Sequence, residues 1–346
     1  MNASSVHASG QRARRLLEEC RARAAAVLGV EDAADVVFTS GATESMNLAL
    51  RGFAASLRRP MRVLSSPLEH SCARDTLDAL AKAGGATVEN LPVDEGGRAL
   101  LPREQPDGAD LLCLMAVNNE TGAVQDLAAA RALRRSPGRM TWLCDAAQAV
   151  GKIPVRAAEW GADWIVASAH KIGGPPGVGL LAGPGTRRLV AQVTGGPQEG
   201  ELRAGTEPLA LIRAFTQALE WAEHEGEARV ARLLAVEDAL LSALRERGVE
   251  FSRNGEPPRA AGLVNVSFPG LEARDVVIAL DQAGIAASPG AACSTGVVAV
   301  SPVLAAMFPS DAARAAGGVR LSFGAGSSVD DARAIAVALG SIVARR

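Results

Sequence analysis

Two residues that commonly take part in catalysis, His170 and Lys171, follow the apolar run Trp164–Ala167 and precede a turn rich in glycine and proline. Such a run is typical of a buried strand, so the lysine is expected at the end of that strand. Burial disfavours a charged amine, and a neutral amine is the form that condenses with an aldehyde to a Schiff base. The stretch therefore predicts a lysine that carries an aldehyde cofactor. The alternative is a lysine that extends its ammonium group from a strand end into water.

Other chemically capable side chains also follow apolar runs. Asp145 comes directly after Thr141–Cys144. A buried carboxylate there needs a partner, which the protonated ring nitrogen of a cofactor would supply, and capping of the next segment is the alternative. Glu69 and His70 follow the run Arg62–Ser65. His70 is a candidate for ring stacking or proton transfer, with a purely structural role as the alternative.

Two further stretches are suited to binding anions. A glycine turn within Ser40–Ser45 opens a helical pattern. Backbone N–H groups and the hydroxyl of Thr43 could bind a phosphate there, although the same residue types cap ordinary helices. Arg320 lies in a strand pattern, Val319–Phe323, that would bury its guanidinium beside a carboxylate. That carboxylate belongs either to a substrate or to an internal salt bridge.

Cys293 is the cysteine best placed to act as a reactive thiol. The chain has five cysteines, with no Cys-x-x-Cys pair and no metal-ligand spacing with its four histidines. We therefore expect no metal site and a reduced, cytoplasmic setting. Cys20, Cys113 and Cys144 fall in helical or apolar patterns, where a free cysteine acts as a small hydrophobic side chain. Cys293 instead lies in a loop pattern of glycine, alanine, serine and threonine.

Composition and charge argue against several classes of protein. The chain has 346 residues, 48% of them hydrophobic, enough for about two domains of roughly 150 residues each. Its 36 basic and 38 acidic residues give a formal net charge of -2, which provides no footprint for nucleic acid or an anionic membrane. The longest apolar run, Ala334–Ala344, is shorter than the ~20 residues of a membrane span. The polar start of the chain is unlike a secretory signal.

Short apolar runs alternate with helical patterns over the first half of the chain, which is typical of an α/β fold with a mostly parallel sheet between helices. The expected strands are Val36–Thr39, Arg62–Ser65, Thr87–Leu91, Leu111–Val117, Thr141–Cys144, Trp164–Ala167 and Val178–Ala182. Helices are expected over Leu16–Leu28, ending at Gly29, and near 44–56, 71–83 and 126–135. Ligands of such folds bind at the carboxyl ends of the strands, where the candidate residues lie.

The pattern changes after a glycine-rich loop at 195–205. A helical stretch over about 209–247 should connect two domains. Beyond it, strands at Leu263–Phe268 and Gly318–Phe323 and helices near 272–283 and from Val329 suggest a smaller α+β domain. The sequence thus predicts an N-terminal segment at 1–15, a large domain at 16–225, and a small domain at 226–346 that carries Cys293 and Arg320.

Taken in order, nine motifs resemble those of the cysteine desulfurases, class V aminotransferase-like enzymes of fold type I that use pyridoxal 5′-phosphate (PLP). The motifs are Asn2–His7, Phe38–Ser45, Glu69–His70, Val117–Gly122, Asp145–Gln148, Ser168–Lys171, Arg203–Thr206, Gly290–Ser294 and Val319–Ser322. They extend over essentially the whole chain, and such an ordered set is far more specific than any one member.

The resemblance implies a role for each matched residue around PLP. Lys171 would form the Schiff base, Asp145 would pair with the ring nitrogen, and His70 would stack on the ring. Groups flanking the phenolate oxygen would be Asn119 and Gln148. Groups near the phosphate would be Ala42, Thr43, Ser168 and His170, joined by Thr206 from the other subunit of a homodimer.

The resemblance also implies the reaction. Arg320 and Asn119 would bind the substrate carboxylate, and Cys293 would attack the sulfur of PLP-bound L-cysteine, giving L-alanine and a Cys293 persulfide. The sulfur would pass to an iron–sulfur scaffold or a thiolation enzyme. Cys293 and Arg320 are 27 positions apart, which resembles the NifS/IscS-like branch with its long cysteine loop.

The chain departs from the family pattern in three places. The segment that usually precedes the Asn2 region has no counterpart here, as expected of a truncation, a misassigned start or a variant. Pro197 replaces a glycine, and Gly200 replaces an arginine in the loop before Thr206. Two alternatives to a cysteine desulfurase therefore stay open. One is a related PLP-dependent lyase or aminotransferase, including a selenocysteine lyase, and the other is a scaffold with impaired catalysis.

Overall fold

A computed structural model describes residues 2–135, 140–290 and 300–345. In it the chain divides into two compact units. Unit 1 comprises Met1–Leu91, Leu101–Ala116 and Asp126–Gly226, and unit 2 comprises Pro92–Leu100, Val117–Gln125 and Glu227–Arg346.

The division differs from the predicted domains in two short segments of the first half of the chain. Pro92–Leu100 and Val117–Gln125 belong to unit 2, whereas the sequence-based division placed them in the large domain. Backbone hydrogen bonds explain the difference, since Val124 donates to the carbonyl of Pro258 at 3.0 Å. Asn119 is consequently a residue of unit 2.

Unit 1 is built on a seven-stranded, mostly parallel sheet, which confirms the predicted fold class. In spatial order the strands are β1 (Val36–Thr39), β7 (Gly179–Ala182), β6 (Trp164–Ser168), β5 (Thr141–Asp145), β4 (Leu111–Cys113), β2 (Met61–Ser65) and β3 (Ala86–Asn90). Only β7 runs antiparallel to its neighbours, β1 and β6, among the strands of this sheet.

The central strands form because their apolar runs can be buried on both faces of the sheet. Every residue of β6 is buried, and in β5 only Thr141 is partly exposed. Leu143 and Val166 share a core cluster with Met46 and Leu50 of the helix that follows β1. Layers of this kind hold the carboxyl edge of the sheet rigid.

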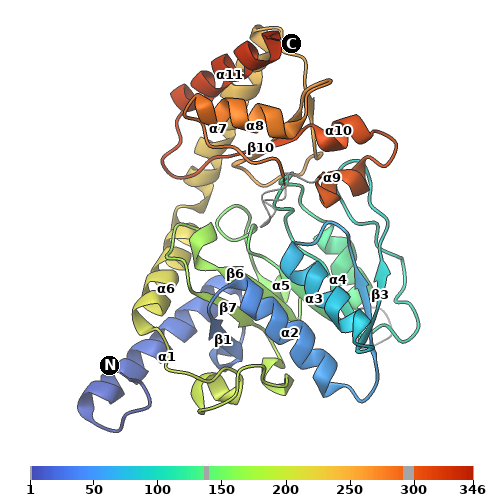
Figure 1. Ribbon diagram of the computed structural model, residues 1–346. Coiled ribbons are helices and arrows are strands. Elements are labelled where there is room, and N and C mark those ends of the chain that lie inside the picture. Colours follow the sequence, from blue (N-terminus) through green and yellow to red (C-terminus); the bar gives the residue numbers. More distant parts are fainter. Residues whose placement is uncertain (1, 136–139, 291–299, 346) are drawn as a thin grey trace. The chain divides into compact units, whose positions relative to one another are not determined.

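Helices surround this sheet. Those of unit 1 are α1 (Ala8–Leu28), α2 (Ala42–Ser56), α3 (Ser71–Lys82), α4 (Leu127–Arg135), α5 (Ala157–Trp160) and α6 (Leu209–His224), with 3₁₀ turns η1 (Ala33–Asp35), η2 (Ala169–Lys171), η3 (Thr186–Arg188) and η4 (Gln198–Glu201). Gly29 ends α1 with a left-handed backbone at φ 66°, as its position in the sequence predicts. Helices α1 and α6 lie side by side although they are far apart in the sequence (Figure 1).

Unit 2 contains a three-stranded antiparallel sheet in the order β10 (Gly318–Ser322), β9 (Leu263–Ser267), β8 (Ser252–Arg253). Its helices are α7 (Gly226–Glu246), α8 (Ala273–Gln282), α9 (Pro302–Met307), α10 (Ala312–Ala316) and α11 (Val329–Ala344). Leu240, Val264, Val319 and Leu339 are fully buried in one cluster between these elements. The helical stretch predicted over about 209–247 is two helices, because α6 ends at His224.

The described residues contain four free, buried cysteines: Cys20, Cys72, Cys113 and Cys144. Burial raises the pKa of the Cys113 and Cys144 thiols well above their ordinary value. These cysteines therefore lack the thiolate character that a nucleophile needs. Across the described ranges no cluster of three or more His, Cys, Asp or Glu side chains could hold a metal ion, and no helix there could cross a membrane.

Candidate active site

Three of the predicted functional side chains follow strands of the unit 1 sheet at its carboxyl edge. His70 is the N-cap of α3 after β2, Asp145 ends β5, and Lys171 ends η2 after β6. Because β2, β5 and β6 are parallel strands of one sheet, their carboxyl ends share an edge. The charges of His70 and Lys171 both act on Asp145. Unit 1 thus brings these three groups into one electrostatic neighbourhood.

Asp145 is a buried carboxyl group, 6% exposed. Its Oδ1 accepts a hydrogen bond from the backbone N–H of Ala147 at 2.9 Å. Burial raises the pKa of Asp145, although that hydrogen bond and the charges of His70 and Lys171 act in the opposite direction. The folded chain therefore does not fully compensate the charge of this carboxylate, and a cationic ligand would.

His70 is fixed by the helix that it caps. Its Nδ1 accepts the backbone N–H of Cys72 at 3.2 Å, which leaves the Nε2 position for the proton of a neutral ring. Desolvation lowers the pKa of His70, Lys171 and Arg74 lower it further, and Asp145 opposes them. The residue nevertheless remains exposed to solvent. An oriented, largely neutral imidazole with a free face is suited to stacking on an aromatic ring.

Lys171 is exposed at the end of the 3₁₀ turn that follows the buried strand, as the alternative of an ammonium group extended into water expects, and its role as the cofactor lysine stays a prediction. The buried run ends at Ala169, and the 3₁₀ turn η2 carries the next two residues out of the sheet. The periodicity of the apolar residues could not show this turn. What distinguishes Lys171 is its electrostatic interaction with Asp145 and His70.

The N-terminus of α2 and the end of β6 lie close together because of a glycine. Gly179 begins β7 and pairs with Thr39 of β1 on one side and Ser168 of β6 on the other. A Cβ atom at Gly179 would lie 2.6 Å from the Cα of Gly41, so only glycine permits this approach. Gly41 caps α2 without any side-chain hydrogen bond to its first turn. The first N–H groups of α2, at Ala42 and the exposed Thr43, therefore remain available to an anion.

Ser168 and His170 lie at the same end of the sheet. The Ser168 hydroxyl and His170 Nδ1 are 2.9 Å apart. Desolvation and the nearby Lys171 lower the pKa of His170. A hydroxyl group, an imidazole and an uncapped helix N-terminus together form a donor set suited to a phosphate.

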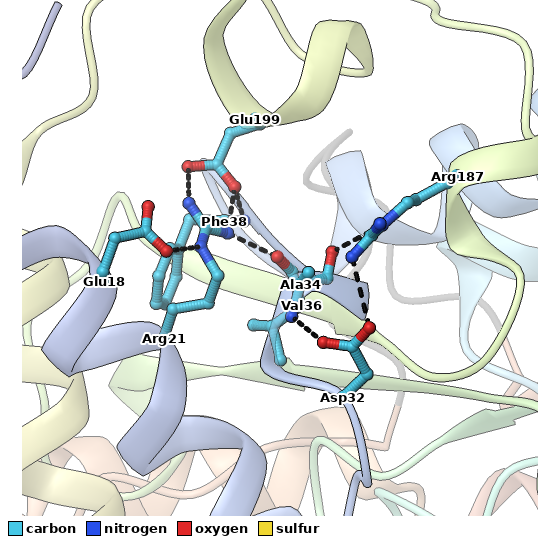
Figure 2. A network of polar contacts seen from close by, with 8 residues as sticks. All are labelled: Glu18, Arg21, Asp32, Ala34, Val36, Phe38, Arg187 and Glu199. Atoms are coloured by element: carbon cyan, nitrogen blue, oxygen red, sulfur yellow. Dashed lines mark hydrogen bonds and ion pairs between the residues drawn. The ribbon is translucent and has the colours of Figure 1, made fainter.

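A buried ion pair between Arg21 and Glu199, drawn in Figure 2, anchors the loop that precedes Thr206 in the sequence. Both oxygens of the Glu199 carboxylate accept from the guanidinium of Arg21, at 2.7 and 3.0 Å, and one of them also accepts the N–H of Phe38 at 2.8 Å. Arg21 donates as well to the carbonyl of Val36. Glu199 keeps this position with a left-handed backbone at φ 49°. The loop is thereby tied to both α1 and β1.

A second ion pair holds the end of the same loop. Arg203 Nε donates to Glu44 of α2 at 2.9 Å. Although burial opposes the effect, hydrogen bonds from Arg203 and Ser40 lower the pKa of Glu44. Thr206 follows three residues later and is exposed, and its contribution to a second subunit remains a prediction. Gly200, noted above as a departure, adopts φ 65°, a conformation that favours glycine.

Unit 2 contains Arg320 and Asn119 as neighbours. Arg320 lies on β10 and donates from Nη1 to the carbonyl oxygen of Asn119 at 3.1 Å. Its buried Nε and the buried Oδ1 of Asn119 have no hydrogen-bond partner among the described residues. Desolvation lowers the pKa of Arg320, while Glu120 opposes the shift. A carboxylate ligand would supply the hydrogen bonds and the charge that this guanidinium lacks.

Glu120 connects the ends of the predicted cysteine loop in unit 2. Ser301 donates its hydroxyl proton to the Glu120 carboxylate, and a Cβ atom at Gly290 would lie 2.7 Å from the same carboxylate oxygen. Ser288 and Arg320 exchange backbone hydrogen bonds at 2.7 and 3.0 Å. Cys293 itself lies outside the described residues.

Comparisons with known proteins agree with this arrangement. The family model of class V aminotransferases matches residues 1–335. The chain belongs to this family. A protein named IscS-like cysteine desulfurase from Mycobacterium tuberculosis is 36% identical over 99% of this chain and 90% of its own. A putative cysteine desulfurase, IscS 1, from Bacillus subtilis is 31% identical over 99% of this chain and 91% of its own. A solved NifS-like protein superposes with a TM-score of 0.89 at 27% identity, covering 100% of this chain and 92% of that one.

PLP is the cofactor of this family, and the residues of unit 1 fit it. Asp145 is a buried anion whose pKa is raised, as a site for a cationic ring nitrogen requires. A Cβ atom at Gly41 would meet nothing within 4 Å, so space is open beside the uncapped N-terminus of α2. Lys171, an exposed residue at the end of η2, supplies the amine. Gln148, predicted to lie near the phenolate oxygen, is half-buried and accepts from the ammonium of Lys152.

Sequence reasoning missed three buried charged residues of unit 1. Arg21 and Glu199 are 178 positions apart, and no local pattern links them. Glu69 was noted only as the neighbour of His70, yet its side chain is fully buried. An acidic residue directly after a buried strand is the signal that could have singled it out.

Proposed function

We propose that the protein is a PLP-dependent cysteine desulfurase that converts L-cysteine to L-alanine and leaves the sulfur as a persulfide on Cys293. The observation that carries this proposal is the grouping of Asp145, His70 and Lys171 at one sheet edge. Near-full-length similarity to proteins named cysteine desulfurases supports the choice of substrate.

PLP, when bound, supplies an electron-accepting ring that stabilises negative charge on an attached amino acid. The chain supplies the groups that make this possible. Asp145 holds the proton on the ring nitrogen, because its buried carboxylate is most stable beside a cation. His70 covers the ring with an imidazole that its Nδ1 contact orients. Lys171 would hold the cofactor through its amine, and that amine is also the group that would move a proton from the substrate carbon.

Substrate binding falls to unit 2 in this proposal. Arg320 would donate a charge-assisted hydrogen bond to the carboxylate of L-cysteine from its Nε, which has no partner among the described residues. The side-chain amide of Asn119 would donate to the same carboxylate from its N–H group, while its Oδ1, an acceptor without a partner in the described ranges, would take a donor of the ligand. Because Arg320 also binds the Asn119 carbonyl, the two residues orient the substrate as a unit.

Sulfur transfer requires a nucleophile, and Cys293 is assigned that role. Its thiolate attacks the sulfur of the bound L-cysteine, so a sulfur–sulfur bond forms as the carbon–sulfur bond breaks. The electron pair of the broken bond remains with the amino acid, which takes up a proton and leaves as L-alanine. Atoms and electrons balance, since one thiol and L-cysteine give one persulfide and L-alanine.

The finer assignments concern the partners. We assign a homodimer in which Thr206 of one subunit contributes to the phosphate site of the other, supported by the two ion pairs that anchor the loop before Thr206. The sulfur acceptor is an iron–sulfur scaffold or a thiolation enzyme, in keeping with relatives that bear IscS names. The compartment proposed is the cytoplasm.

The test uses purified protein loaded with PLP. We expect a yellow protein whose absorbance disappears in Lys171→Ala, and release of L-alanine and sulfide from L-cysteine with a reductant. Cys293→Ala should abolish sulfide release but keep the colour, and Cys20→Ala, a buried cysteine of α1, is the matched control. Undiminished cysteine turnover in Cys293→Ala would refute the desulfurase mechanism and favour another PLP reaction. Protein that cannot be loaded with PLP would favour a catalytically impaired scaffold.

A further inference from the structure

At the carboxyl edge of the unit 1 sheet, strand β2 ends before the segment that continues its neighbour, β4. Strands β2 and β4 pair through Val63 with Leu111 and Leu64 with Leu112, and β2 ends at Ser65. Beyond β4 the chain continues along β5: Leu114 N–H donates to the carbonyl of Leu143 at 3.1 Å and Ala116 N–H to that of Asp145 at 2.9 Å.

The backbone N–H of Met115 lies between those two donors. Successive N–H groups of an extended chain point to opposite sides, so this one points to the side that β2 has left. The carboxyl group of Glu69 takes the place of the missing strand, accepting the Met115 N–H at 2.9 Å. Glu69 is 1% exposed and immediately precedes His70. This one side chain therefore links the turn that carries His70 to the strand that binds the backbone of Asp145.

The second oxygen of Glu69 is buried and has no hydrogen-bond partner among the described residues. An ionised carboxylate with a single hydrogen bond is costly to bury, and a protonated one much less so. The charged or titratable groups around it are Asp145, Arg74, Cys72, Cys113 and Cys144. Burial raises the pKa of Glu69 well above its ordinary value; the hydrogen bond from the Met115 N–H opposes this, Asp145 adds to it, and Arg74 has the smallest, opposing effect.

We propose that Glu69 is a positioning residue that acts as a neutral carboxylic acid, bracing His70 and Asp145 while leaving Asp145 to carry the negative charge at the ring nitrogen. The PLP part of this inference rests on the proposed function. The ring nitrogen of PLP then has a single carboxylate, that of Asp145, as its charged partner. An ionised Glu69 would add a second negative charge and favour protonation of Asp145.

Infrared spectroscopy of the PLP-free protein tests the protonation state directly. At neutral pH we expect the carbonyl band of a buried carboxylic acid, and we expect Glu69→Gln to remove it. The matched control is Glu237→Gln, because Glu237 is equally buried but forms an ion pair with Arg253 at 2.6 Å and accepts from the Gly262 N–H. That variant should leave the band intact. A band that is absent, or that survives in Glu69→Gln, overturns the neutral acid.

PLP binding tests the positioning role. A glutamine is neutral and can still accept from Met115, so Glu69→Gln should keep the PLP dissociation constant within about twofold. The pH titration of the bound chromophore should also be the same in Glu69→Gln and wild type. If Glu69 were ionised in wild type, its replacement by a neutral glutamine would remove a negative charge and shift that titration. Glu69→Ala removes the carboxyl acceptor of the Met115 N–H and should weaken PLP binding about tenfold. Equal affinity in Glu69→Ala and wild type overturns the role.

Failure of this inference is distinguishable from failure of the proposed function. The infrared band and the PLP affinity are measured without L-cysteine, so they do not depend on desulfurase activity. Should Glu69→Ala not fold, the chromophore titration of Glu69→Gln still decides the matter. A protein that binds PLP as expected but releases no sulfide would contradict the proposed function and leave the role of Glu69 intact.

Discussion

The two units each contain a charge that the folded chain does not balance, and the charges have opposite signs. In unit 1, Asp145 is a buried carboxyl group whose pKa is raised by burial. In unit 2, Arg320 is a half-buried guanidinium whose pKa is lowered by desolvation. Both shifts disfavour the charged form. Unit 1 therefore requires a cation and unit 2 an anion, as a cofactor ring nitrogen and a substrate carboxylate would provide.

In the ion pair of Arg21 and Glu199, by contrast, the charge of each buried side chain is compensated by the other. The carboxylate accepts two hydrogen bonds from the guanidinium and one from a backbone N–H. This pair has a structural role, and nothing in its surroundings requires a ligand. In this chain an incompletely compensated charge, more than burial alone, therefore distinguishes the residues that we propose bind ligands.

The largest effect should come from removing the anion of unit 1. Asp145→Asn deprives the ring nitrogen of its partner, and we expect turnover of L-cysteine to fall about 1000-fold, comparable to removal of a key electrostatic group in other enzymes. Stopped-flow or steady-state sulfide assays on PLP-saturated protein would measure it. Asp110→Asn is the control, since Asp110 pairs with the exposed Arg59 and should leave turnover unchanged. A comparable loss in both variants would contradict the role of Asp145.

The next effect concerns the balanced pair. Arg21→Met leaves Glu199 buried without its cation, and the free energy of unfolding should fall by about 3 kcal/mol. Chemical denaturation would measure it. Arg333→Met removes the guanidinium of an exposed pair with Asp330, and the midpoint should hardly change. Equal destabilisation by the two substitutions would show that the Arg21 pair is no more important than a surface one.

A smaller effect is expected from weakening the cation of unit 2. Arg320→Lys keeps the charge but loses the planar set of donors, so KM for L-cysteine should rise about 30-fold. PLP affinity should stay at the wild-type value, because Arg320 belongs to the substrate contacts in this account. Arg333→Lys is the control, since Arg333 is exposed on α11. A loss of PLP affinity in Arg320→Lys without any change in KM would break the assignment.

Sequence patterns predicted the sheet of unit 1 well because each buried strand is a continuous apolar run. The same patterns placed His70 and Asp145 correctly at strand ends. They could not show how exposed Lys171 is, because it ends a 3₁₀ turn, Ala169–Lys171, that follows the buried strand. They also extended β4 beyond Cys113, where the chain still follows β5 but no longer has β2 beside it.

Long-range contacts account for what the sequence could not predict. Glu69 becomes important only because β2 leaves the sheet before the segment that continues β4, and no local pattern reports that. The contact between Arg21 and Glu199 joins α1 to a distant loop. Asn119 belongs to unit 2 because residues near 258 provide the backbone partners of its segment. The role of Cys293 remains a prediction, since it lies outside the described residues.

The smallest of the expected effects depends on pH and on whether PLP is bound. Because the pKa of Asp145 is raised in the folded protein, this carboxyl group binds its proton more tightly in the folded protein than in the unfolded chain. The associated stabilisation is complete below the unfolded pKa of Asp145 and is lost as pH rises through the folded value. At neutral pH the ionised Asp145 therefore costs the PLP-free protein stability, and Asp145→Asn should recover about 1 kcal/mol.

Thermal unfolding of wild type and Asp145→Asn, each with and without saturating PLP at neutral pH, would show whether the charge of Asp145 is compensated by the cofactor. We expect the order of stability to reverse: Asp145→Asn is the more stable protein without PLP and the less stable one with it. The same order of stability in both states would show that PLP does not compensate the charge of Asp145.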